Sequence, residues 1–204
     1  MLYKNRQKFN QLSIKIGIAF SKIPLSANQW TIVSILPALA ALYFLIQNDF
    51  LLAGSFFILA GFVDMIDGAV ARVTRTVSKF GAYLDTIVDR YIEAIIVFGL
   101  LFVGLPGLYL PAFAWIFLYL FGSMMTTYAK AAAKEKEIIP EGSELKGGIM
   151  ERAERLIILF IGIIAAAFNP FYLICVVALL AALTNISALQ RVWIARGFAR
   201  AKKP

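Results

Sequence analysis

The sequence has 204 residues, of which 61% are hydrophobic and 16% are charged, and its mean hydropathy is +0.79. These values are typical of a polytopic membrane protein. The chain has no histidine and a single cysteine, Cys175, in an apolar run, which excludes histidine catalysis, histidine or cysteine metal sites and a disulfide framework. The net charge of +8 favours lipid headgroups or phosphorylated substrates as partners, and the apolar composition argues against nucleic acid.

The apolar stretches within residues 1–24 are too short to span a membrane. One arc of the expected helix carries Phe9, Leu12, Ile16, Phe20 and Ile23, and the stripe beside it carries Lys4, Lys8, Lys15 and Lys22. This pattern predicts an interfacial amphipathic helix. The alternative is a basic flank ahead of the first span. No small-residue cleavage site is present, so we do not expect a signal peptide.

The rest of the chain predicts an all-α bundle of six transmembrane helices over residues 25–204, so that residues 1–204 form a single membrane domain. The expected spans are 29–47, 50–72, 81–103, 108–130, 149–168 and 170–191. All 20 basic residues lie in the N-terminal segment, in 72–79, in 130–155, in the tail or at Arg90. The positive-inside rule therefore predicts cytoplasmic termini and a site on the cytoplasmic side of the cell membrane.

Four aspartates lie in two pairs on the second and third expected spans. Asp64 and Asp67 are three residues apart and Asp85 and Asp89 are four apart, so each pair projects from one face of its helix. Ionisable groups at membrane depth are costly and usually functional. Neighbouring carboxylates repel one another, and oxygen-only ligands suit Mg²⁺ or Mn²⁺. The pattern predicts a site for two divalent ions; the alternative is a structural polar network, for which nearby bases are too few.

Gly68 and Arg72 follow the first aspartate pair. Gly68 permits a close approach to the helix backbone, for which a substrate phosphate is a candidate. Arg72 lies about one turn beyond Asp67, where its guanidinium can bind a phosphate through two hydrogen bonds.

The spacing Asp-x2-Asp-Gly-x2-Ala-Arg-x8-Gly-x3-Asp-x3-Asp, which begins at Asp64, resembles the signature of the CDP-alcohol phosphotransferases at every defined position. The resemblance implies a homodimeric enzyme, built as a six-helix membrane bundle with an N-terminal amphipathic helix, in which an alcohol displaces CMP from a CDP-linked substrate. It implies that all four aspartates bind metal and that Asp89 deprotonates the acceptor hydroxyl. It places the nucleotide on Gly68, Ala71, Arg72, Ser78 and Gly81.

The first span opens with Ser26-Ala27-Asn28-Gln29-Trp30-Thr31. Many relatives carry Thr-Pro-Asn here, at the cytidine end of the nucleotide site. Because Ala27 stands in place of the proline, the resemblance carries a nucleotide-binding role only to Asn28 and Thr31. An ordinary helix N-cap at Ser26 or Asn28 is the alternative.

The fifth span opens with Gly-Gly-Ile-Met-Glu-Arg-Ala-Glu-Arg, residues 147–155. Basic residues oppose the dipole at a helix N-terminus, so a bound anion would explain them; an interfacial charge belt is the alternative. The stretch looks like the branch of the family whose acceptor is inositol 1-phosphate. The resemblance implies that the acceptor phosphate binds Arg152 and Arg155, and that the cluster extends to Lys130, Lys134 and Arg191.

These observations predict a Mg²⁺-dependent transferase (EC 2.7.8 type) of phospholipid biosynthesis, which moves a phosphatidyl-type group from a CDP-linked lipid to inositol 1-phosphate and releases CMP. Within the family, the alternatives are glycerol 3-phosphate as acceptor, or CDP-inositol with inositol phosphate. In a different class, the alternative is a divalent-cation transporter. A transport path would continue across the membrane, yet the first, fourth and sixth expected spans contain no acidic residue.

Overall fold

The structure is a computed structural model that describes residues 6–139 and 148–201, with no side chains described for residues 6–10 and 201. Helices account for nearly all of the regular structure in these ranges. The helices fall into two compact units, Met1–Gly99 and Leu100–Pro204.

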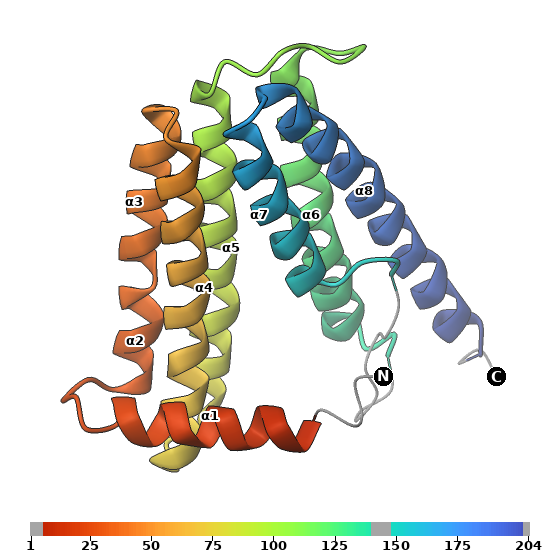
Figure 1. The fold of residues 1–204 in the computed structure, drawn as a ribbon. Coiled ribbons are helices and arrows are strands. Elements are labelled where there is room, and N and C mark those ends of the chain that lie inside the picture. The colour runs from red at the N-terminus through yellow and green to blue at the C-terminus, as the bar shows by residue number, and fades with distance from the viewer. Residues whose placement is uncertain (1–5, 140–147, 202–204) are drawn as a thin grey trace. The chain divides into compact units, whose positions relative to one another are not determined.

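The first unit contains one helix that lies across the ends of longer ones (Figure 1). Its helices are α1 (Arg6–Phe20), α2 (Ala27–Val33), α3 (Ile35–Ile46), α4 (Phe50–Val73) and α5 (Lys79–Gly99). α2 and α3 continue one another with an interruption at Ser34, because Pro37 has no N–H to donate to the carbonyl of Val33. α3 packs against both α4 and α5.

Small and branched side chains hold these helices together. One buried cluster joins α3, α4 and α5 through Ala38, Ala60, Val88 and Ile92. A second joins α1, α2 and α4 through Trp30, Ile66 and Val70, with Ile16 and Phe20 packed against them. The alanines allow the backbones to approach closely, which is how membrane helices gain packing contacts.

α1 covers part of the stretch for which the N-terminal pattern predicts an interfacial amphipathic helix. Its place at the membrane interface stays a prediction, and its apolar residues divide between the protein interior and the exposed face. Gly17 contacts α4 so closely that a Cβ there would lie 2.5 Å from the carbonyl oxygen of Ala69. This contact turns Ile16 and Phe20 into the protein, whereas the side chains that stay about half exposed are those of Leu12, Ile14 and Ile18. Of the other residues in the predicted pattern, Lys4 lies outside the described residues, and Lys8 and Phe9 lie outside the described side chains.

The second unit consists of η2 (Leu100–Phe102), α6 (Ala112–Glu135), α7 (Arg152–Ala166) and α8 (Pro170–Ala201). α8 packs along both α6 and α7 (Figure 1). Gly122 of α6 lies directly against Thr184 and Asn185 of α8, and the Asn185 side-chain amide donates to the carbonyl of Leu118 at 2.9 Å. Gly162 of α7 likewise admits a side chain of α8.

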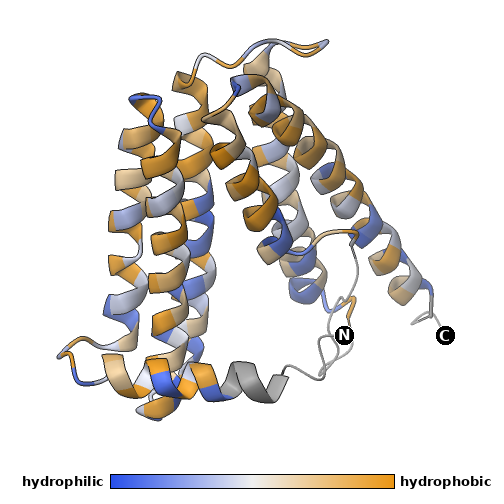
Figure 2. Cartoon of the chain, viewed as in Figure 1, coloured by the Kyte–Doolittle hydropathy of each residue, from blue (hydrophilic) through white to orange (hydrophobic). Residues whose placement is uncertain are grey.

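Four helical stretches are long and apolar enough to cross a membrane, so the chain is an all-helical membrane protein within the described ranges. They are Ala27–Ile46, Phe50–Val73, Ala112–Glu135 and Pro170–Arg200. α5 carries Asp85, Asp89, Arg90 and Glu93, and α7 has only 15 residues, so their assignment as the third and fifth of six spans stays a prediction. The last helix continues beyond the predicted end of its span at Arg191, to Ala201, because residues 192–201 contain no proline to interrupt it. Figure 2 shows mainly hydrophobic residues over the first half of α8 and a mixture of hydrophilic and hydrophobic residues toward its end.

The contact of Gly122 predicts a selective loss of stability. In Gly122→Ala, the added methyl group would lie 2.6 Å from Nδ2 of Asn185, so we expect overpacking to cost about 1–3 kcal/mol. The control is Gly61→Ala, because no atom lies within 4 Å of the added Cβ there. Thermal unfolding in detergent should show a lower midpoint for the first variant and an unchanged or higher one for the second. Equal shifts would contradict this account of α6–α8 packing.

Candidate metal and nucleotide site

Three of the four predicted aspartates come together. Asp64 and Asp67 of α4 and Asp85 of α5 each offer a carboxylate oxygen, and the three oxygens lie within 4.8 Å of one another. Oxygens that ligate Mg²⁺ at about 2.1 Å lie roughly 3 to 4 Å apart. Small side-chain movements would therefore bring this cluster onto a divalent ion, and its all-oxygen donor set fits Mg²⁺ or Mn²⁺.

Asp89 is not one of the three clustered carboxylates. It lies one turn beyond Asp85 on α5 and is half-buried. Its predicted roles as a metal ligand and as the catalytic base therefore stay predictions.

Thr31 of α2 holds one of the clustered carboxylates. Its hydroxyl donates to Oδ2 of Asp67 at 2.5 Å, and the backbone N–H of Gly68 donates to Oδ1 of the same carboxylate. Thr31 is only 2% exposed and Asp67 only 7%. Donors of this kind fix the orientation of metal ligands. The sequence predicts a nucleotide contact for Thr31 but gives no signal of this contact with a residue 36 positions away.

A cavity of about 330 Å³ opens beside the carboxylates, between α2, α4, α5 and the loop that precedes α5. Asp67 and Asp85 contribute to its wall. All seven residues predicted to bind nucleotide also line it: Asn28, Thr31, Gly68, Ala71, Arg72, Ser78 and Gly81. The wall includes Thr76 and Val77 as well, two variable positions of the signature that the sequence does not single out.

Gly81 allows two polar side chains to converge on this cavity. A Cβ at Gly81 would lie 3.2 Å from both Oδ1 of Asn28 and Oγ of Ser78, and the Gly81 N–H donates to that Oγ at 3.0 Å. The cap of α2 is Ser26, whose hydroxyl accepts from the N–H of Gln29 at 3.3 Å. The N-cap alternative therefore holds for Ser26 and leaves Asn28 in the cavity wall.

The space above Gly68 is taken by Arg72. Nη1 of Arg72 lies 3.3 Å from where a Cβ of Gly68 would be, and Nη2 donates to Oγ of Ser13 on α1 at 2.7 Å. The sequence predicts a substrate phosphate over this glycine, whereas the structure places a guanidinium there. The guanidinium is a fork of N–H donors that matches a phosphate.

In the second unit, two of the five predicted acceptor residues meet at Thr126 of α6. Nη1 of Arg155 donates to the Thr126 hydroxyl at 3.1 Å, and Nη1 of Arg191 donates to its carbonyl at 2.5 Å. Arg155 is 2% exposed. Lys130 and Lys134 follow Thr126 by one and two turns on α6, and both are exposed.

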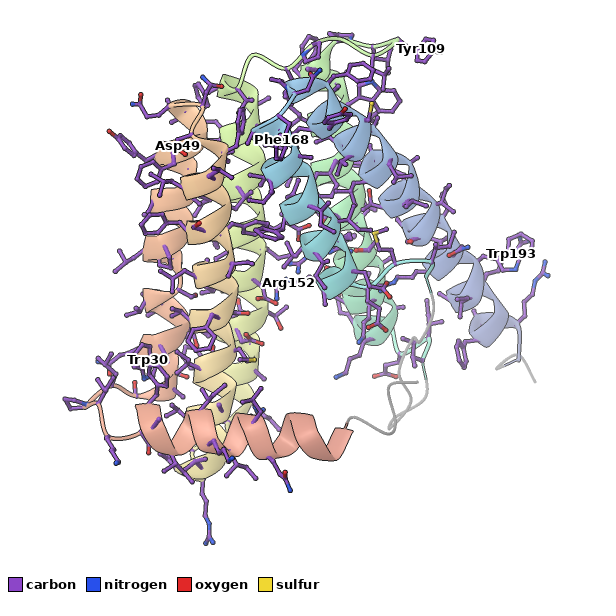
Figure 3. All side chains as sticks on the ribbon, viewed as in Figure 1. Trp30, Asp49, Tyr109, Arg152, Phe168 and Trp193 are labelled. Carbon is purple, nitrogen blue, oxygen red and sulfur yellow. The ribbon has the colours of Figure 1, made fainter. Side chains whose placement is uncertain are left out.

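The start of α7 shows why acidic residues accompany these arginines. Glu151 and Glu154 form a capping box, in which Oε2 of Glu154 accepts from the N–H of Glu151 at 2.9 Å. Arg152, labelled in Figure 3, lies at this end of α7 and is half-buried. The carboxylates thus satisfy backbone donors at the helix start.

Apolar helices that carry an all-oxygen carboxylate cluster beside a cavity of this size are typical of a membrane enzyme that uses divalent ions. The chain belongs to the CDP-alcohol phosphatidyltransferase family, whose model matches residues 25–190. It is therefore a transferase of phospholipid biosynthesis, which rules out the cation-transporter alternative as its family function.

Two curated relatives are archaetidylinositol phosphate synthases. The chain is 40% identical to that of Pyrococcus horikoshii, over 96% of this chain and 97% of the relative. It is 32% identical to that of Methanothermobacter thermautotrophicus, over 84% of this chain and 83% of the relative.

A solved structure shares the fold. The crystal structure of Mycobacterium tuberculosis phosphatidylinositol phosphate synthase with CDP-DAG bound matches with a TM-score of 0.79 and 26% identity, over 91% of this chain and 94% of that one. The same enzyme in complex with manganese and citrate matches with a TM-score of 0.80 over 90% of this chain and 88% of that one.

The hydrogen bond from Thr31 to Asp67 predicts a change in metal affinity. In Thr31→Val the carboxylate loses a donor that orients it, so we expect Mn²⁺ to bind about 10-fold more weakly or worse. Thr31→Ser keeps the hydroxyl and should bind nearly as well as the parent. Thr86→Val is the control, because the hydroxyl of this exposed residue donates within α5, to the carbonyl of Ala82 at 2.9 Å. Titration of Mn²⁺ by electron paramagnetic resonance would measure all three, and unchanged affinity in Thr31→Val would refute the orienting role.

Proposed function

We propose that the protein transfers a phosphatidyl-type group from a CDP-linked lipid to inositol 1-phosphate and releases CMP, with Mg²⁺ or Mn²⁺ as cofactor. One observation carries the proposal: the cavity lined by the seven residues predicted to bind nucleotide lies directly against the cluster of Asp64, Asp67 and Asp85. The inositol phosphate acceptor is supported by the names of the relatives in Pyrococcus horikoshii and Methanothermobacter thermautotrophicus.

The first unit would bind the donor. A volume of about 330 Å³ suits a nucleotide headgroup and leaves the lipid chains to the bilayer. Asn28 and Ser78 would contact the cytidine end, and Arg72 would bind the diphosphate through its free donors. Two divalent ions held by the aspartates would neutralise the diphosphate and stabilise the departing phosphate.

Asp89 would act as the base. Its carboxylate takes the proton of the acceptor hydroxyl as the hydroxyl oxygen bonds to phosphorus. The bond from that phosphorus to the CMP oxygen breaks, and CMP leaves as a phosphate monoester.

The basic cluster of the second unit would bind the acceptor phosphate. Arg155 and Arg191 are held by hydrogen bonds to Thr126, so their guanidinium groups are already oriented before substrate arrives. Arg152, Lys130 and Lys134 would complete the cluster. Glycerol 3-phosphate carries the same phosphate, so an assay has to compare the two alcohols directly.

The membrane arrangement belongs to the same proposal. We assign six spans, with α5 and α7 as the third and fifth, in a single domain, because the family match covers both units. α1 lies at the interface with its half-exposed Leu12, Ile14 and Ile18 toward lipid. Both termini and the site lie on the cytoplasmic side of the cell membrane, and the enzyme is a homodimer.

The proposal predicts which mixture releases CMP. Purified protein with a CDP-lipid should release CMP only when Mg²⁺ or Mn²⁺ and inositol 1-phosphate are both present, and EDTA should abolish the release. Release with glycerol 3-phosphate and not with inositol 1-phosphate would show that glycerol 3-phosphate is the acceptor.

The proposed base predicts a loss of turnover. Asp89→Asn should lower kcat by about 10²-fold or more at saturating metal. Asp49→Asn is its matched control, because Asp49 only caps α4 and asparagine also caps helices.

The acceptor site predicts a change confined to one substrate. Lys130→Ala should raise the KM for inositol 1-phosphate about tenfold or more, because a charge-assisted contact to phosphate is lost, and leave the KM for CDP-lipid unchanged. Lys136→Ala is the control, since Lys136 pairs with Glu135 at the end of the same helix. Arg155→Lys keeps a charge at the buried position and should show the same selectivity. A rise in both KM values would remove the acceptor assignment.

A further inference from the structure

Arg72 lies between two cavities of the first unit. On one side it lines the nucleotide cavity. On the other it lines a groove of about 490 Å³ with Ser13, Ile14, Ile18 and Val73. The hydrogen bond from Nη2 to Ser13 draws that nitrogen toward α1, while Nη1 lies over Gly68.

The position of Ser13 is set by the docking of α1. Ser13 lies one turn before Gly17, so both face α4. Gly17 brings the two backbones into contact, since a Cβ there would lie 2.6 Å from Cγ2 of Val73. Three residues further on, Phe20 packs edge-on against Trp30, with ring centroids 5.4 Å apart. The docking of α1 therefore fixes the position of Ser13, and Ser13 in turn holds the long side chain of Arg72 through its hydrogen bond.

We propose that Ser13 is a positioning residue for the CDP-linked donor: it holds the Arg72 guanidinium at the mouth of the nucleotide cavity before the donor binds. The inference rests on the proposed function only in that Arg72 contacts the donor's diphosphate. A guanidinium has five N–H donors, and the bond to Ser13 uses one of them, so four remain for phosphate oxygens. Fixing a flexible side chain in its bound orientation beforehand strengthens binding.

The test uses the full chain reconstituted in lipid and two readouts. The first is the rate of CMP release, which gives the KM for the CDP-lipid and kcat separately. The second is the Kd for free CDP in Mg²⁺, measured by calorimetry, which needs no acceptor and no turnover. The variants are Ser13→Ala, Ser13→Thr, Arg72→Ala and the double variant. Ser21→Ala is the matched control, because the Ser21 hydroxyl donates only to the carbonyl of Ile18.

We expect Ser13→Ala to raise both the KM for CDP-lipid and the Kd for CDP by about three- to tenfold, with kcat nearly unchanged. Ser13→Thr should restore both values, and Ser21→Ala should change neither. In the Arg72→Ala background, Ser13→Ala should add nothing, because the two residues act as one unit. If Ser13→Ala weakens binding equally in that background, leaves binding unchanged or tightens it, the positioning role is wrong. If CDP binds as expected but no mixture releases CMP, the proposed reaction fails and the positioning role stands.

Discussion

Mutual repulsion among three carboxylates is the constraint on which the first unit depends. At about 5 Å and an effective dielectric constant of 20, each pair of ionised carboxylates repels by roughly 3 kcal/mol. The hydrogen bond from Thr31 to Asp67 contributes about 1.5–3 kcal/mol, which does not offset three such pairs. A divalent cation held by the three carboxylates would offset the repulsion, and would make an arrangement that is costly in an apolar bundle attractive to the diphosphate of a nucleotide. The packing that brings the carboxylates together, through Ala38 and Ala60, therefore serves the site as much as the fold.

Glycines decide how closely the elements of that site approach. Gly17 lets α1 touch α4 and carries Ser13 to Arg72, while Gly81 lets Asn28 and Ser78 enter the same cavity wall. In each case a methyl group would lie 3.2 Å or less from a polar atom of a neighbouring segment. The family signature thus combines residues that bind with a residue whose lack of a side chain leaves room for them.

The spacing of the signature predicts what lies on one helix. Asp64 and Asp67 share α4, and their three-residue spacing predicts that both project from one face of it. Asp67 lines the cavity, and Asp64 joins it in the carboxylate cluster. Contacts between remote segments leave no periodic signal, which is why the sequence does not reveal that Thr31 orients Asp67 or that Ser13, 59 residues away, holds Arg72. The same limit explains the face of α1: docking through Gly17 packs the partly buried Ile16 and Phe20 against the protein, whereas periodicity alone predicts that they face the membrane. Hydropathy predicted the bounds of α4 to within one residue, but it does not decide whether α5 spans the membrane, because α5 carries Asp85, Asp89, Arg90 and Glu93.

The opposite charges of the two predicted substrate sites follow from the chemistry of the substrates. Both the CDP-linked donor and a phosphorylated alcohol are anions, so an enzyme that joins them must neutralise both before the hydroxyl can reach phosphorus. A diphosphate is suited to metal ions, because its leaving phosphate gains charge during the reaction and a carboxylate cluster can hold the ions beside it. A phosphate monoester that does not react needs only to be held, and arginine forks do so without competing for the metal. Arg155 and Arg191, both hydrogen-bonded to the single residue Thr126, are the arginines predicted to hold it within the second unit.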